Sequence, residues 1–265
     1  MATSCPVGFN VERLREHVRS MYDRLARDPE GEFHFHRGPA YAAERLRYDA
    51  AELAQLPAEC TERFAGVGNP LRIGPIHAGE TVLDHACGAG LDLLLAARRT
   101  GATGRAIGVD MTPAMREHAG AAARAAGLDD VVEVHAGLFE DLPLPSASVD
   151  VVISNGVVNL APDKLRVFRE IARVLRPGGR LYLADVVVRR ELKLEVRSNP
   201  DLWAACIGGA LPVPELVEIA ALVGLQGGRV LESFDCFAAT EISTRVASDL
   251  DVHAVNFFAA KPAEP

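Results

Sequence analysis

Two acidic residues frame a run of small residues whose spacing suits ligand binding. Residues 81–92 read TVLDHACGAGLD: an apolar run ends at Asp84, small residues continue to Gly90, and a helical pattern begins at Leu91. A strand, a tight turn and a helix in this order bring backbone N–H groups and the positive end of a helix dipole close to a ligand. The chemistry that these residues predict is recognition of a nucleotide-like molecule.

A second acid, Asp110, agrees with this prediction. Asp110 ends another short apolar run, which begins at Ala106, and it follows Gly90 by 20 residues. In doubly wound α/β folds, an acid at about this distance accepts hydrogen bonds from ribose hydroxyls. The residue three places after Gly90 is Leu93, so the Gly-x-Gly-x-x-Gly pattern of dinucleotide sites is absent.

The elements that must position these residues alternate between strand and helix. Periodicity predicts strands that end at Asp84 and Asp110, and further strands at 131–135, 149–154, 180–188, 229–235 and 251–259. It predicts helices at 91–97, 112–126, 162–175 and 215–223. This alternation is typical of an α/β fold.

Before this core, the chain is predicted to be mainly helical. An amphipathic pattern predicts a helix at 11–26 with Asn10 as its N-cap, and a second helical stretch is predicted at 40–56. Residues 32–38 alternate in the manner of a strand, so His34 and His36 are expected to share one face. We treat both histidines as candidate catalytic bases; the alternatives are a metal pair or polar neighbours of a ligand pocket.

Composition narrows the class of protein. The chain has 265 residues and a formal net charge of −8, which argues against a nucleic-acid partner because such a surface needs a basic stripe. No apolar run is long enough to span a bilayer and no targeting signal is recognised, so we expect a cytoplasmic protein without a membrane partner. The five cysteines contain no Cys-x-x-Cys pair, which argues against a disulfide framework or a metal site.

Residues 84–90 resemble motif I of class I S-adenosylmethionine-dependent methyltransferases, in which an acid precedes Gly-x-Gly-x-Gly. Ala86 replaces the first of those glycines. The later motifs of that class follow in their proper order, as residues 142–145, 148–152, Asn155 and 175–179. Within the class, the segments 108–115, 152–160 and 205–210 are most similar to the arsenite methyltransferase family.

The resemblance implies a fold and a division of the chain. The implied fold is a Rossmann-like class I methyltransferase fold, whose seven-stranded, mostly parallel sheet ends in an antiparallel strand. Residues 1–70 would form the helical N-terminal cap and residues 71–265 the methyltransferase domain. An active-site insertion would occupy 190–213, after the fifth strand. A homodimer through the two C-terminal strands is left open.

The resemblance also implies S-adenosyl-L-methionine as cofactor. Asp110 would bind its ribose, Met111 would pack on its adenine, and Asn155 would lie under its sulfonium. Tyr22 resembles a tyrosine that closes over the cofactor, with a core tyrosine as the alternative. The full implied set is Tyr22, Asp84, Ala86, Gly88, Gly90, Asp110, Met111, Leu138, Phe139, Glu140 and Asn155.

Two departures from the family concern the methyl acceptor. Arsenite methyltransferases bind trivalent arsenic through three cysteines, and here Val67 and Gly156 replace two of them while Cys206 retains the third. Soft arsenic demands soft thiolates. We therefore predict methyl transfer to a small, organic acceptor. The alternatives are a methyltransferase for trivalent arsenicals with a reduced cysteine set and a cofactor-binding protein without catalysis. Cys206 is a candidate catalytic residue that lines the acceptor site; the alternative is that it is a small buried residue without a role.

Overall fold

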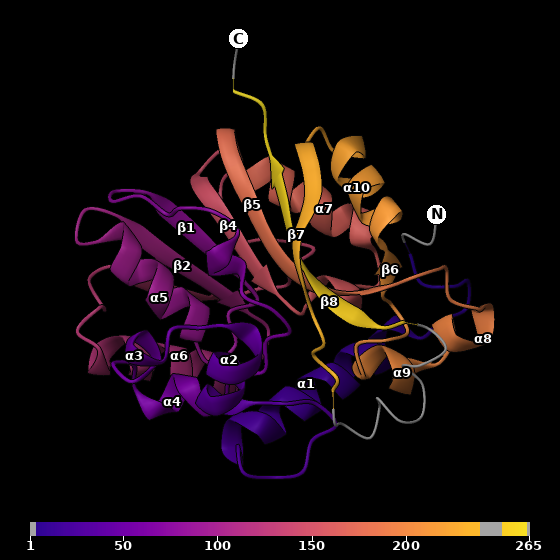
Figure 1. Cartoon of the computed structure of the whole chain (residues 1–265), viewed down its shortest axis with the longest axis horizontal. Coiled ribbons are helices and arrows are strands. Elements are labelled where there is room, and N and C mark those ends of the chain that lie inside the picture. Colours follow the sequence, from indigo (N-terminus) through magenta and orange to yellow (C-terminus); the bar gives the residue numbers. More distant parts are fainter. Residues whose placement is uncertain (1–3, 239–250, 264–265) are drawn as a thin grey trace.

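A single mixed sheet forms the centre of the molecule. The computed structural model describes residues 4–238 and 251–263. The strand order is β3-β2-β1-β4-β5-β8-β7, with the short β6 paired to β5 (Figure 1). The strands are β1 (Thr81–His85), β2 (Arg105–Asp110), β3 (Val132–Ala136), β4 (Val149–Asn155), β5 (Leu175–Val188), β6 (Leu211–Pro212), β7 (Gln226–Phe234) and β8 (His253–Ala260).

The topology confirms the predicted Rossmann-like fold. Strands β1 to β5 pair in parallel, whereas β8 runs antiparallel to both β5 and β7. The seven expected strands are present, and β6 is an addition of two residues at the end of β5. Because the carboxyl ends of β1, β2 and β4 lie at one edge, the acids that end these strands are brought together there.

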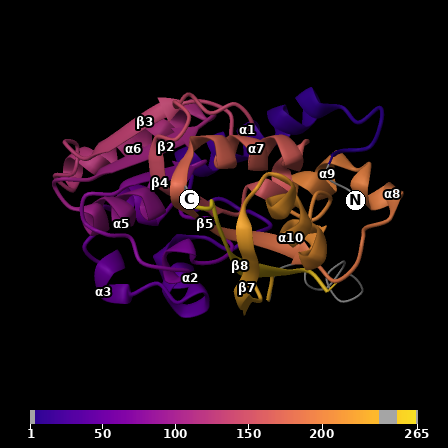
Figure 2. The same ribbon diagram turned by 90° about the horizontal axis from the view of Figure 1, so that it is seen from above.

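Helices cover both faces of this sheet, and neighbouring residues of β1 show the division. Val82 belongs to an apolar cluster with Leu94 of α5 (Leu91–Thr100) and Met115 of α6 (Pro113–Ala125). Leu83 belongs to a second cluster, which includes side chains of α7 (Lys164–Val174) and α10 (Val213–Leu222). Helices α5 and α10 lie toward opposite ends of the sheet (Figure 2).

The N-terminal residues form four helices, which are gathered below the sheet in Figure 1. They are α1 (Val11–Arg27), α2 (Gly38–Leu46), α3 (Ala50–Leu53) and α4 (Ala58–Thr61). As predicted, Asn10 caps α1, because its side chain accepts a 2.9 Å hydrogen bond from Arg13 N. Helix α1 packs on α6 and on α9 (Pro200–Ala204). In the sequence, α8 (Leu194–Arg197) and α9 come between β5 and α10.

Two predictions in this region are wrong. Residues 32–37 form no strand, because no strand of the described residues pairs with them and the Phe33 and Phe35 rings pack on each other at 5.3 Å. The single helix predicted at 40–56 is interrupted, because Arg47 adopts a left-handed conformation (φ 61°) that ends α2. Asp49 then caps α3 by accepting from Ala51 N at 2.7 Å.

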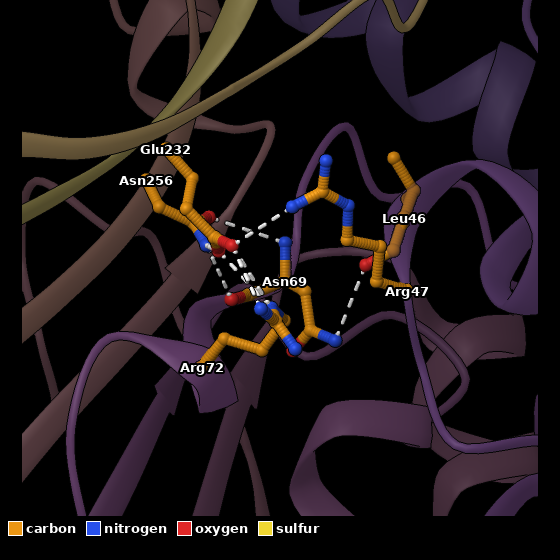
Figure 3. A network of polar contacts seen from close by, with 6 residues as sticks. All are labelled: Leu46, Arg47, Asn69, Arg72, Glu232 and Asn256. Carbon is orange, nitrogen blue, oxygen red and sulfur yellow. Dashed lines mark hydrogen bonds and ion pairs between the residues drawn. The ribbon is translucent and has the colours of Figure 1, made fainter.

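A polar network fastens the N-terminal residues to the antiparallel edge of the sheet (Figure 3). The side chain of Asn256 on β8 holds the backbone of Asn69 on both sides: its Oδ1 accepts from Asn69 N at 3.2 Å and its Nδ2 donates to Asn69 O at 2.8 Å. Glu232 of β7 accepts from Asn256 Nδ2 at 3.0 Å and pairs with Arg47 and Arg72. This network fixes the path of residues 64–69, the connector, which crosses to the 3-10 turn at Pro70–Arg72.

Within residues 4–238 and 251–263, no helix combines the length and the apolar character that crossing a membrane requires.

Candidate active site

One pocket opens where β1, β2 and β4 end. Its space is about 860 Å³ when the part open to solvent is included. The predicted cofactor residues that line it are Tyr22, Asp84, Ala86, Gly88, Gly90, Asp110, Met111, Phe139 and Asn155. The structure places Leu138 and Glu140 outside the lining, in the turn that follows β3.

The turn after β1 has an unusual backbone conformation, which allows a ligand to approach its N–H groups closely. Ala86, Gly88 and Gly90 all have positive φ, at 69°, 52° and 95°. For Ala86 this conformation is strained, because its Cβ crowds the backbone in the left-handed region. At Gly90 a Cβ would lie 3.2 Å from Cβ of Ala119, so glycine permits the close packing of α5 on α6.

Asp110 ties this turn to the end of β2. Its carboxylate accepts from Gly88 N at 2.9 Å and from Thr112 N at 2.7 Å. Burial raises the pKa of Asp110, and these backbone hydrogen bonds oppose that change by stabilising the charged form. A carboxylate held in this way still has lone pairs to accept from a diol in the pocket.

Two further carboxylates in the pocket wall form no ion pair with any residue that the structure describes. Asp84 is 3% exposed, and its Oδ2 has no hydrogen-bond partner among the described residues. Burial, with the charges of Asp92 and Asp110, raises the pKa of Asp84 well above its usual range. Burial raises the pKa of Asp92 to about 6. A buried orphan acceptor beside a second buried acid is a complementary site for a positively charged ligand group.

The Asn155 side chain connects these acids to the connector. Its Oδ1 accepts from Val67 N at 2.8 Å and from Gly68 N at 3.2 Å, and its Nδ2 donates to Asp92 Oδ2 at 2.9 Å. Tyr48 O–H donates to the other oxygen of Asp92 at 2.6 Å. Asn155 therefore both lines the pocket and holds residues 66–68 over it.

The candidate histidine bases lie elsewhere. His34 and His36 line a separate surface groove with residues 29–40, and neither lines the pocket. His36 Nε2 lies 2.7 Å from the carbonyl oxygen of Ala238, and its ring stacks on Tyr41 at 5.1 Å. Burial lowers the pKa of His34.

Another histidine, His85 of β1, is fully buried, and its contacts are structural. Burial lowers its pKa to about 4, so the imidazole is neutral near pH 7. Its ring nitrogens lie 3.1 Å from the carbonyl oxygen of Phe139 and 3.3 Å from Ser154 Oγ. His85 thus fixes the backbone of a pocket-lining residue to the strands.

The positions where family cysteines are missing face each other. A Cβ on Gly156 would lie 3.2 Å from Val67 Cγ1. A methyl group of Val67 therefore lies against the Gly156 backbone at the place where the family has two thiols. Cys206 is 8% exposed and does not line the pocket. Burial raises its pKa to about 12, which keeps the group a thiol at neutral pH.

Several residues that line the pocket were not predicted from the sequence. Cys60 and Arg63 line the pocket from the α4 region, and Val18 lines it from α1. Val18 could have been found from its helical spacing to Tyr22, whereas nothing in the sequence near α4 indicated that this short helix would reach the pocket. In the part of the chain that the structure describes, no group of three His, Cys, Asp or Glu side chains is placed to hold a metal ion.

Comparisons with known proteins agree on one family. A family model described as "Methyltransferase domain" matches residues 76–238. An arsenite methyltransferase of Halobacterium salinarum is 40% identical over 212 residues, which cover 80% of this chain and 52% of that protein. A 27-O-demethylrifamycin SV methyltransferase of Amycolatopsis mediterranei is 34% identical over 140 residues, covering 53% of this chain and 48% of that protein. The chain thus spans about half the length of these curated relatives.

A solved structure supports the same grouping. The crystal structure of an arsenic (III) S-adenosylmethionine methyltransferase from Chlamydomonas reinhardtii superposes with a TM-score of 0.70 at 36% identity. The match covers 81% of this chain and 73% of that one.

The raised pKa of Asp92 predicts a pH dependence of stability. An acid whose pKa is higher in the folded state binds more protons there, so it costs stability as the pH rises from about 4 to about 6. Asp92→Asn removes this cost. In urea unfolding of the cofactor-free protein, the variant should therefore gain on the wild type by up to about 3 kcal/mol across this pH range. A difference that stays constant from pH 4 to pH 7 would contradict the assignment.

Proposed function

The chain belongs to the methyltransferase domain family, and from this premise we propose that it transfers a methyl group from S-adenosylmethionine to a small organic acceptor. The observation that carries the proposal is the pair of buried carboxylates, Asp84 and Asp92, which line the glycine-turn pocket. Neither forms an ion pair among the described residues, and Asp84 Oδ2 has no hydrogen-bond partner there. S-adenosylmethionine carries an ammonium group and a sulfonium, and the orphaned Asp84 Oδ2 is a suitable acceptor for the ammonium.

The remaining lining residues suit the other parts of this cofactor. Asp110 would accept from the ribose hydroxyls, while Met111 and Phe139 offer apolar surfaces to the adenine. Residues 86–90 would bring backbone close to the methionine portion. When bound, S-adenosylmethionine supplies an electrophilic methyl group on sulfur. The task of the chain is then to hold the acceptor in line with that methyl group, since proximity and orientation supply much of the rate.

The wall around Asn155 favours an organic acceptor. Phe64, Gly66, Val157 and Leu160 make this part of the pocket mainly apolar. Val67 and Gly156 replace two arsenic-binding thiols by an aliphatic contact, which removes the donors that inorganic arsenic needs.

The set of titratable lining residues indicates the kind of nucleophile. Among the described residues, no histidine lines the pocket, and the lining carboxylates are the groups proposed to bind the cofactor. The site therefore offers the acceptor no imidazole base. A nucleophile that needs no proton removal by the protein, such as a thiolate or an acceptor that is already ionised, fits this site best. The acidic balance of the chain also favours a small molecule over a nucleic acid.

A second candidate function is methylation of an organic trivalent arsenical. Its supporting observation is that Cys206 retains one thiol of the family and that Cys236, 3% exposed and two residues beyond β7, is a second buried thiol. Burial raises the pKa of Cys236, and a thiolate at Cys206 would raise it further, which is consistent with the two sulfur atoms being near each other. Two thiols can hold an arsenical that has two exchangeable positions, whereas arsenite has three. The relatives named for arsenite and arsenic (III) add to this support.

Formation of S-adenosylhomocysteine by the purified protein tests the proposal. With S-adenosylmethionine and a reducing thiol, we expect turnover with members of a panel of aromatic thiols and ionisable phenols, and only background with arsenite. Turnover with a monomethyl trivalent arsenical alone would select the second candidate. Cofactor binding without turnover on any acceptor would indicate a binding protein instead. Asp110→Asn is the cofactor control and should raise KM for S-adenosylmethionine about tenfold or more, since it weakens the acceptor for the ribose.

Restoring the missing thiols tests why arsenite is excluded. Because a Cβ at position 156 would lie 3.2 Å from a Val67 methyl, cysteines at both positions would meet beside Asn155, which lines the pocket. Val67→Cys with Gly156→Cys should bind arsenite at about one equivalent after desalting, and it should gain arsenite-dependent turnover.

Val67→Cys alone is the matched control, since it adds one thiol without a neighbour and without the strain that a side chain meets at φ 76°. If the double variant retained no more arsenic than this control, the thiol explanation would fail.

A further inference from the structure

Arg15 and Glu140 join the first helix to the turn that follows β3. Arg15 Nη2 donates to Glu140 Oε1 in an ion pair between residues 125 positions apart. The Glu140 side chain is only 4% exposed, and Arg15 is the one partner that the described residues give it. The hydrogen bond with Glu140 raises the pKa of Arg15, so the guanidinium stays charged.

Each partner of this ion pair lies next to residues of the pocket. Val18 and Tyr22 follow Arg15 on α1 by three and seven positions, so the three side chains share one helix face, and both Val18 and Tyr22 line the pocket. Phe139, which precedes Glu140, lines the pocket from the other side. The pair therefore spans two walls of the same pocket.

The two sides of the pair differ in how firmly they are held. The turn at 138–141 is closed by a hydrogen bond from Asp141 N to Leu138 O at 3.0 Å. It is connected to the sheet through His85 of β1, whose Nε2 lies 3.1 Å from the carbonyl oxygen of Phe139. Helix α1 instead rests on other helices, α6 and α9, and pairs with no strand. If one side moves when a ligand enters or leaves, α1 is the side with fewer constraints.

We propose that the Arg15–Glu140 ion pair is a latch that holds α1, with Val18 and Tyr22, closed over the bound cofactor. Arg15 is a positioning residue here, because it acts through the helix that it fastens. This inference rests on the proposed function, since the ligand whose release is slowed is S-adenosylmethionine or its demethylated product. Breaking the pair leaves Glu140 buried without a partner, which favours the open arrangement.

The chain offers a matched control for the latch. Arg15 Nη1 also pairs with Glu12 at 2.9 Å, but Glu12 is 78% exposed and lies on the same helix. Removing Glu12 takes away a solvent-exposed partner of Arg15 and leaves the link between the two walls intact. An exposed pair of this kind contributes little.

Dissociation of S-adenosylhomocysteine from the full chain tests the latch. We expect Arg15→Gln and Glu140→Gln each to raise the dissociation rate and the Kd about tenfold, with KM for S-adenosylmethionine rising while kcat stays within about twofold. Arg15→Lys should recover most of the loss, the double variant should be no worse than either single one, and Glu12→Gln should match the wild type. Hydrogen exchange of residues 11–27 should quicken in the two latch variants.

Two results would separate the possible failures. If the wild type binds S-adenosylhomocysteine and the latch variants release it at the wild-type rate, with only a lower melting temperature, the pair is structural and the latch is overturned. If the wild type binds neither S-adenosylmethionine nor S-adenosylhomocysteine, the proposed function itself fails.

Discussion

The burial of negative charge at the carboxyl ends of β1 and β2 is the constraint on which the rest of this structure depends. Asp84, Asp92 and Asp110 are each less than a tenth exposed, and burial raises the pKa of all three. Backbone and side-chain hydrogen bonds satisfy Asp110 and Asp92, but Asp84 keeps one oxygen without a partner. Such an arrangement costs stability in the empty protein and is offset when a cation binds.

Hydrogen bonds connect the segments around the pocket to these acids and so determine where the segments lie. Asn155 and Tyr48 donate to Asp92, and Asn155 also holds the backbone of residues 66–68. The same connector is fastened at Asn69 by Asn256, which Glu232 supports from the edge of the sheet (Figure 3). A change at the outer strands can therefore reach the pocket wall through a short series of hydrogen bonds. This connection explains why residues far apart in sequence form one site.

The structural features that were predicted correctly from the residues alone depend on short-range patterns in the sequence. Strand ends at Asp84 and Asp110, the cap of α1 by Asn10 and the glycine turn were readable because each depends on neighbouring residues. The seven-stranded, mostly parallel sheet and its antiparallel last strand came from a family resemblance, and the structure confirmed them. The order of the strands in the sheet was not predicted.

What the sequence could not predict depends on long-range contacts. Alternation at residues 32–38 suggested a strand, but a strand needs a partner, and the described chain offers none there. His34 and His36 were candidates as bases only by residue type, and the fold carries them to another groove. Arg63, Tyr48 and the Arg15–Glu140 pair act across separations in sequence that no periodicity reports. The division into a cap of residues 1–70 and a domain of 71–265 stays a prediction.

Proton exchange on cofactor binding is the most direct test of whether the buried acids Asp84 and Asp92 receive the positively charged group of the cofactor. Near pH 6 the unliganded protein should hold protons on Asp84 and Asp92, and a docked ammonium group should lower both pKa values and expel them. Calorimetric titration with S-adenosylmethionine in two buffers of different ionisation enthalpy measures this exchange. If the buried acids bind the ammonium group, cofactor binding releases protons overall, and the Asp92→Asn variant releases fewer. Binding with net proton uptake, or with no exchange between pH 5.5 and 7, would show that these buried acids are not the site of the cation.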